Sequence, residues 1–287
     1  MSAQALHNRA PLISAALFLA AALLCWMLIA SHLPKLLEPT GSYDVERMIA
    51  LYSTLPRMVT ALLCGAALSL SGVLLQIVLR NPLASPTTLG VSAGAHLALV
   101  LATLFAPALI SFSRDLVAAA GSVVAAGLVF ALVARRNFSP VTLILGGLVV
   151  SLYCGAAATL LVLLNDRYLA SLFIWGAGSL SQQDWSIPLG LAPKLAILGV
   201  AAVLLLRPLA VLNVGDDAAR ALGAKPGLLR ALTVAVAIGL AALVTSAVGV
   251  IGFIGLAAPA LARIAGARTI PSQMLWSTLL GGSLLFL

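Results

Sequence analysis

The residues with the clearest chemical potential are a serine and a histidine at helical spacing. Residues 90–94 read Gly-Val-Ser-Ala-Gly, the G-x-S-x-G pattern of a serine nucleophile, and His96 follows Ser92 by four residues, on the same helical face. A nucleophile elbow needs a turn between a strand and a helix, but this motif opens a long apolar run. Gly90 and Gly94 also form G-x-x-x-G, which lets membrane helices approach closely. We therefore favour helix packing and keep an intramembrane serine hydrolase using Ser92 and His96 as the alternative.

Other catalytic patterns are missing from the sequence. It has no G-x-x-x-x-G-K-[ST] run, so any ATP hydrolysis would belong to another subunit. Cys25, Cys64 and Cys154 lie inside apolar runs, without disulfide or metal-ligand spacing. We expect no catalytic residue, no metal site and no cofactor in this chain.

The composition indicates a membrane protein. The 287 residues are 62% hydrophobic and 8% charged, whereas a soluble domain carries about 25% charged residues. The apolar runs are long and do not alternate with polar residues, which favours helices over a membrane β-barrel. The net charge of +8 could suggest nucleic-acid binding, but the basic residues flank the apolar runs, as topology signals do.

The apolar runs predict nine helices within a single transmembrane domain, residues 1–287, with an all-α bundle fold. The expected spans are 12–30, 55–79, 88–108, 115–134, 141–164, 188–209, 228–249, 253–265 and 274–287. The last run is too short to cross a bilayer, so we expect the sequence to end inside its ninth helix. With a cytoplasmic N-terminus, ten Lys and Arg residues fall inside and six outside, as the positive-inside rule requires.

Two features of the connections bear on function. The longest inner loop, 212–230, contains an expected short helix, 216–222, with Asp216 and Asp217 at its start and Gly223 at its stop. Between Trp175 and Trp185 an irregular outer stretch predicts a short helix that dips back into the membrane. No expected span carries a charged pair at its centre, which argues against a proton- or sodium-coupled carrier and favours a conduit driven by another protein.

Three long segments in order resemble a known family. Residues 54–95, 248–263 and 215–223 are similar to the two signatures and the cytoplasmic coupling segment of FecCD-type permeases, which serve ABC importers of iron–siderophores and vitamin B12. Within that family, residues 140–155 and 173–185 are most similar to the first half of a fused, double-length ferric hydroxamate permease. The chain departs from the family pattern at Ala260, where a histidine is common, and at Thr54, where an arginine is common.

The resemblance implies a type II ABC importer permease fold with ten helices per half, in the bacterial inner membrane. It implies transport of iron(III)-hydroxamate siderophores, with vitamin B12 or another siderophore as the alternative. The implied partners are two ABC ATPase subunits that bind ATP and magnesium, a periplasmic siderophore-binding protein and a second permease half or subunit.

The resemblance also implies roles for individual residues. The expected ATPase contact is formed by Asp216, Asp217, Ala219, Arg220, Leu222 and Gly223. The inner gate would comprise Ser139, Pro140 and Val141, and the binding protein would dock on Arg57 and Arg47. The signature positions are Arg80, Asn81, Pro82, Gly90, Gly94, Gly252, Gly255 and Pro259.

Overall fold

The computed structural model describes residues 48–134, 140–165, 178–180, 185–221 and 223–286. The expected first span, 12–30, lies outside this part of the chain, as does most of the expected outer helix between Trp175 and Trp185. Throughout the described ranges the regular elements are helical, which confirms the all-α prediction. Among these residues, five helices are long and apolar enough to cross a membrane.

Helices follow one another along the described part of the chain. They are the π-helical segment η1 (Ala50–Thr54) and the α-helices α3 (Leu55–Val78), α4 (Val91–Phe105), α5 (Pro107–Ala134), α6 (Pro140–Leu163), α8 (Ser186–Leu204), α9 (Leu206–Val214), α10 (Asp216–Ala221), α11 (Pro226–Val248), α12 (Ile254–Ile264) and α13 (Ile270–Phe286).

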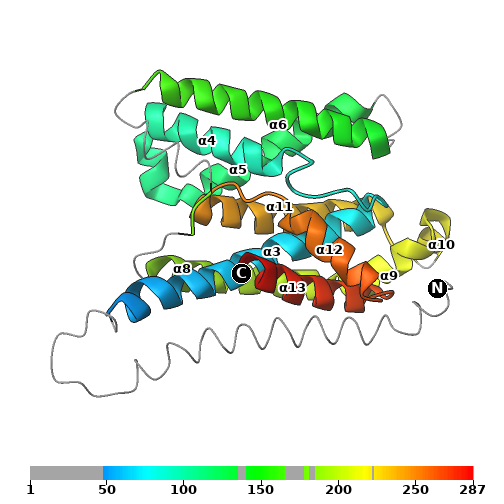
Figure 1. Ribbon diagram of the computed structural model, residues 1–287. Helices are drawn as coiled ribbons and strands as arrows, with labels where there is room; N and C mark the ends of the chain where they lie inside the picture. Colours follow the sequence, from blue (N-terminus) through cyan, green and yellow to red (C-terminus); the bar gives the residue numbers. More distant parts are fainter. Residues whose placement is uncertain (1–47, 135–139, 166–177, 181–184, 222, 287) are drawn as a thin grey trace, which may run out of the picture.

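Helix α3 lies at the centre of the bundle, where it packs against α8, α11, α12 and α13. Helices α4, α5 and α6 pack together as a second group, which α11 joins to the first through its contacts with α4 and α5 (Figure 1). Leu74 and Leu75 of α3 are fully buried, whereas on α6 the side chains of Leu152 and Tyr153 are 64% and 80% exposed. Short α10 stands at the end of the molecule that the C-terminus of α3 approaches.

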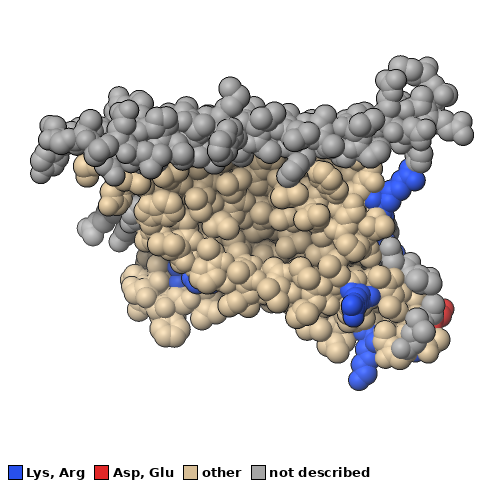
Figure 2. Space-filling model, turned by 90° about the horizontal axis from the view of Figure 1, so that it is seen from below, with Lys and Arg blue, Asp and Glu red and all other residues tan. Residues whose placement is uncertain are grey.

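The outer surface of the bundle is largely uncharged. In the face shown in Figure 2, Lys and Arg side chains lie toward the ends of a broad surface without charged groups. Large apolar side chains such as Phe112, Leu164 and Val124 point out of the bundle. Soluble proteins rarely expose apolar surface on this scale, so this surface is suited to lipid, as the composition predicted.

Small residues allow the helices to approach closely, as expected from the sequence. A Cβ atom on Gly94 would lie 2.6 Å from the carbonyl oxygen of Gly121 on α5. Gly90, however, is not on the same helix face, because it precedes α4 in a left-handed conformation with φ 72°. The expected G-x-x-x-G pair is therefore replaced by a glycine pair across two helices.

Two expected spans differ from the structure because of proline. The span 188–209 is divided into α8 and α9 at Leu205. Pro208 has no N–H to donate to the carbonyl of Leu204, and its ring collides with that carbonyl in a continuous helix. The last helix begins at Ile270 rather than at Met274.

The earlier start of α13 has a local cause. The hydroxyl of Thr269 accepts a 3.3 Å hydrogen bond from the backbone N–H of Ser272, and Pro271 suits the first turn of a helix. The polar residues that looked like a loop are therefore the capped first turn of α13.

Three further helices also differ from the expected spans at one end or both. The helix that contains α3 begins before Thr54, since η1 continues directly into it, so part of the expected outer loop is helical. Helix α4 is shorter than the expected span 88–108 because the chain turns until Gly90. Helix α5 begins at Pro107, ahead of the expected span 115–134, with a kink at Ser113.

Candidate coupling and docking sites

The expected coupling segment is a short helix with defined ends. Helix α10 covers Asp216–Ala221. Gly223 has φ 79°, its N–H bonds to the carbonyl of Arg220 at 2.9 Å, and the N–H of Ala224 bonds to that of Ala219 at 2.9 Å. This pair of bonds is a Schellman motif, which requires a left-handed residue at the stop. The predicted stop at Gly223 is confirmed.

The polar face of α10 is open to a partner. Arg220 is 64% exposed and makes a 3.0 Å ion pair with the fully exposed Asp217. Ala219 is fully buried and anchors the opposite face of the helix. The charged face of α10 is therefore accessible to solvent, and its contact with an ATPase stays a prediction. Leu222 and the side chain of Asp216 lie outside the described structure.

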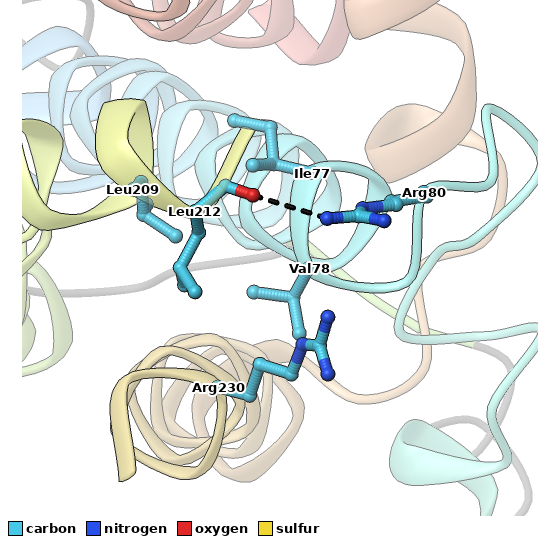
Figure 3. Close-up of a pocket in the computed structure, with 6 residues that line it drawn as sticks. All are labelled: Ile77, Val78, Arg80, Leu209, Leu212 and Arg230. Atoms are coloured by element: carbon cyan, nitrogen blue, oxygen red, sulfur yellow. Dashed lines mark hydrogen bonds between the residues drawn. The ribbon is translucent and has the colours of Figure 1, made fainter. Parts of the chain in front are cut away.

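Arg80, from the first signature, lies beside the segment that leads into α10. Its guanidinium Nη2 donates a 3.0 Å hydrogen bond to the carbonyl oxygen of Leu212 in the last turn of α9 (Figure 3). Arg230 of α11 extends toward the same small cavity, which has a volume of about 10 Å³ and is also lined by Leu209. Residues from α3, α9 and α11 therefore meet at the base of the coupling segment.

The rest of the first signature forms an ordered turn between α3 and α4. Asn81 is buried, and its side-chain oxygen accepts a 3.0 Å bond from the N–H of Leu83. Pro82 is exposed beside it. The hydroxyl of Ser151 on α6 donates a 3.1 Å bond to the carbonyl of Thr87, which fixes the turn against α6. These signature residues therefore hold the turn between α3 and α4 in one conformation.

The second signature forms an irregular connection and a short helix. Gly249 has φ 82° and Phe253 has φ 65°, so the chain leaves α11 without helical geometry and restarts at α12. Gly255 of α12 packs against α3, and Pro259 is buried inside α12. By contrast, Gly252 has no atom within 4 Å of an added Cβ. With 11 residues, α12 is shorter than a membrane span.

The opposite end of the bundle carries the expected docking residue. Arg57 is exposed, near the start of α3 and next to the buried Pro56. Trp185 donates a 2.9 Å hydrogen bond from Nε1 to the carbonyl of Leu51, which ties the start of α8 to η1. Arg47 lies outside the described residues. The structure thus leaves Arg57 accessible, and its docking role stays a prediction.

A cluster of charged and polar side chains between α5, α8 and α11 was not predicted from the sequence. Lys194, in the middle of α8, forms an ion pair with Asp115 of α5, and Ser246 of α11 donates a hydrogen bond to the other carboxylate oxygen at 2.5 Å. The expectation that charges sit only near helix ends is therefore wrong for Lys194. The partners are 79 residues apart in sequence, and no local pattern pairs them.

The cavity beside this cluster is smaller than a usual small-molecule site. Its volume is about 180 Å³, and its lining includes Arg114, Asp115 and Lys194. Sites for small molecules usually have volumes of about 300–1,000 Å³.

The structure does not support the hydrolase alternative. Ser92 is buried within α4, and its hydroxyl has no hydrogen-bond partner among the described residues, so His96 does not contact it as a base would. Within the same part of the chain, no group of three or more His, Cys, Asp or Glu side chains could hold a metal. The expected inner gate is described only in part: α6 begins at Pro140, Ser139 lies outside the described residues, and the side chains of Pro140 and Val141 are not described.

The sequence is similar to membrane transport proteins of known class. The FecCD transport family matches residues 11–287. The iron(3+)-hydroxamate import system permease protein FhuB of Salmonella typhimurium is 44% identical over 278 residues, which cover 95% of this chain and 40% of that protein. The hemin transport system permease protein HmuU of Yersinia pestis is 35% identical over 233 residues, 78% of this chain and 69% of that protein. The chain thus spans about two fifths of the length of FhuB.

Solved structures have the same fold. An inward-facing metal-chelate type ABC transporter superposes with a TM-score of 0.72 at 27% identity, covering 98% of this chain and 88% of that one. PsaBC from Streptococcus pneumoniae reaches a TM-score of 0.59 at 17% identity, covering 79% of this chain and 78% of that one. The family match over almost the whole sequence, the fold and the two signatures agree: this chain is a multi-pass membrane protein of the FecCD transport family.

Proposed function

We propose that this chain is a translocation subunit of an ATP-driven importer that carries iron(III)-hydroxamate siderophores across the bacterial inner membrane. The observation that carries the proposal is the 44% identity to a hydroxamate import permease over nearly the whole chain. Relatives named for ferric citrate or ferric enterobactin are 34–36% identical. Hydroxamate is therefore the favoured chelate class.

The proposed division of labour follows from the two ends of the bundle. Two ATPase subunits bind ATP and magnesium and contact α10 through Arg220, and a periplasmic binding protein delivers the chelate at the end that carries Arg57. The N-terminus lies in the cytoplasm. This chain takes no part in bond-breaking chemistry, which fits the unpartnered hydroxyl of Ser92. The inner gate is assigned to Ser139, Pro140 and Val141 by family resemblance.

We also propose a second permease half or subunit as a partner. The exposed apolar face of α6 includes Leu148, Leu152 and Tyr153, and the cavity beside Asp115 and Lys194 is too small for the chelate. A pathway between two halves accounts for both observations.

Transport by the assembled importer tests the proposal. The permease, with its second half, the ATPase and the binding protein, is reconstituted in vesicles, and uptake of an iron-radiolabelled hydroxamate chelate is compared with that of ferric citrate, hemin and vitamin B12. ATP-dependent accumulation of the hydroxamate alone is expected. Preferred uptake of vitamin B12 or hemin would contradict the substrate, and loss of uptake in a folded Ser92→Ala variant would favour the hydrolase alternative.

A further inference from the structure

Arg80 occupies a backbone position that normally belongs to glycine. Its φ is 48°. Its N–H bonds to the carbonyl of Ile77 at 3.3 Å, and the N–H of Asn81 bonds to that of Gln76 at 3.1 Å. These two bonds make a Schellman motif at the end of α3, with Arg80 as the left-handed residue. Glycine takes this conformation without steric cost and arginine does not. The arginine side chain should therefore make an interaction that glycine could not provide.

The side chain of Arg80 reaches a helix end far away in the sequence. Its hydrogen bond to the Leu212 carbonyl joins residues 132 positions apart. The last carbonyls of a helix lack α-helical partners and carry its partial negative charge, and besides the Arg80 bond the Leu212 carbonyl accepts a long 3.3 Å bond from the N–H of Gly215. A guanidinium is therefore a strong partner for the end of α9, immediately before Gly215 and α10. Leu209 and Leu212 are both buried, so this end of α9 is held firmly against the bundle.

The same end of α3 also binds α12. Gln76, one turn before Arg80, is buried, and its side-chain oxygen accepts a hydrogen bond from Nη1 of Arg263. Arg263 lies in the last turn of α12. The end of α3 is therefore bonded on one side to the segment that carries α10 and on the other to the helix of the second signature.

We propose that Arg80 is a positioning residue that transmits displacement of α10 to α3 and, through Gln76 and Arg263, to α12. The proposal rests on the proposed function, in which the ATPase moves α10. Helix α9 is separated from α8 by the break at Leu205, so α8 does not hold α10 rigidly. The Arg80 bond adds a directional polar link to the packing of Leu209 and Leu212, which holds the end of α9 against the bundle.

The variant Arg80→Gly removes the guanidinium but keeps a residue that favours the left-handed conformation. In the assembled importer in vesicles, ATP hydrolysis and chelate uptake are measured on the same preparation. We expect hydrolysis to stay within about twofold of wild type and uptake per ATP to fall about tenfold, the scale set by loss of a charge-assisted hydrogen bond such as that to the Leu212 carbonyl. Arg80→Lys, which keeps a cationic donor, should recover at least half of the lost ratio.

A second measurement does not depend on the substrate. Spin labels at the exposed positions Ala221 on α10 and Leu83 beside Arg80 report the distance between the coupling helix and the end of α3 with and without nucleotide. We expect one narrow distribution in wild type and a broadened one in Arg80→Gly, with Arg80→Lys intermediate.

The outcomes separate the two proposals. Unchanged uptake per ATP together with an unchanged distance distribution in Arg80→Gly would overturn the role of Arg80 and leave the proposed function intact. Reduced insertion of Arg80→Gly, with hydrolysis and uptake lowered equally, would also overturn it, because it would show a purely structural residue. If the wild-type importer carries no hydroxamate, the proposed function fails, and the label distances still decide the role of Arg80.

Discussion

Gly72 of α3 and Gly255 of α12 are in backbone contact, so that a Cβ atom on Gly72 would lie 1.8 Å from the carbonyl oxygen of Gly255. This contact joins the two family signatures in space. Real Cβ atoms do not come so close to backbone, so Gly72→Ala must push α12 away from α3. We expect a loss of stability of about 1–3 kcal/mol, the usual cost of overpacking, measured as a lower melting temperature in detergent.

Gly127→Ala is the matched control for Gly72→Ala. Gly127 also lies within a membrane helix, α5, but no atom lies within 4 Å of its added Cβ. Alanine favours helix more than glycine does, so stability should stay equal or rise slightly. Equal melting temperatures for the two variants would show that the α3–α12 contact is looser than the structure indicates.

The exposed side chain of Arg220 should carry the contact with the ATPase. Arg220→Glu reverses a charge that is 64% exposed and places it beside Asp217, so we expect normal insertion but at least about a tenfold loss of ATPase affinity. Binding of the purified ATPase to permease vesicles measures this, and Arg220→Lys is the charge-preserving control. Normal ATPase binding and normal uptake by Arg220→Glu would show that α10 is not the contact with the ATPase.

Arg57 should affect the rate at which the binding protein arrives. A charge at the rim of an interface mainly changes association and its salt dependence, and Arg57 is exposed at the start of α3. We expect Arg57→Ala to slow association about threefold to tenfold at low salt and much less at physiological salt. Stopped-flow measurements check this, with Arg57→Lys as control; identical rates at low salt would count against docking there.

The ion pair between Asp115 and Lys194 should stabilise the contact of α5 with α8. Lys194→Met alone leaves the Asp115 carboxylate with its hydrogen bond from Ser246 and should cost about 1–3 kcal/mol, less than for a fully buried pair because Lys194 is 50% exposed. The double variant Asp115→Asn with Lys194→Met removes both charges and should have a higher melting temperature than Lys194→Met. If the stability lost in the double variant equals the sum of the losses in Lys194→Met and Asp115→Asn, the two groups do not interact.

Local signals in the sequence predicted the parts of the fold that depend on neighbours along the chain. Helix α11 begins and ends within two residues of its expected bounds, and the stop of α10 at Gly223 follows from glycine geometry. The bonds from Arg80 to Leu212 and from Lys194 to Asp115 join residues 132 and 79 positions apart. These bonds depend on how the helices pack, which composition and spacing do not encode. The sequence therefore predicted which loops form the site, but not the contacts that their side chains make with other helices.

The π-helical segment η1 changes the helix face on which the residues before α3 lie, which matters for a scanning experiment. A π turn holds one residue more than an α turn, and each residue of an α-helix turns the chain by about 100°. A helical wheel that continues α3 backward through Ala50–Thr54 therefore misplaces Met48 and Ile49 by about that angle. Cysteine labelling along residues 48–62 should show a phase jump at the segment, and alignments with relatives that lack the extra residue will need a one-residue gap there rather than in a loop.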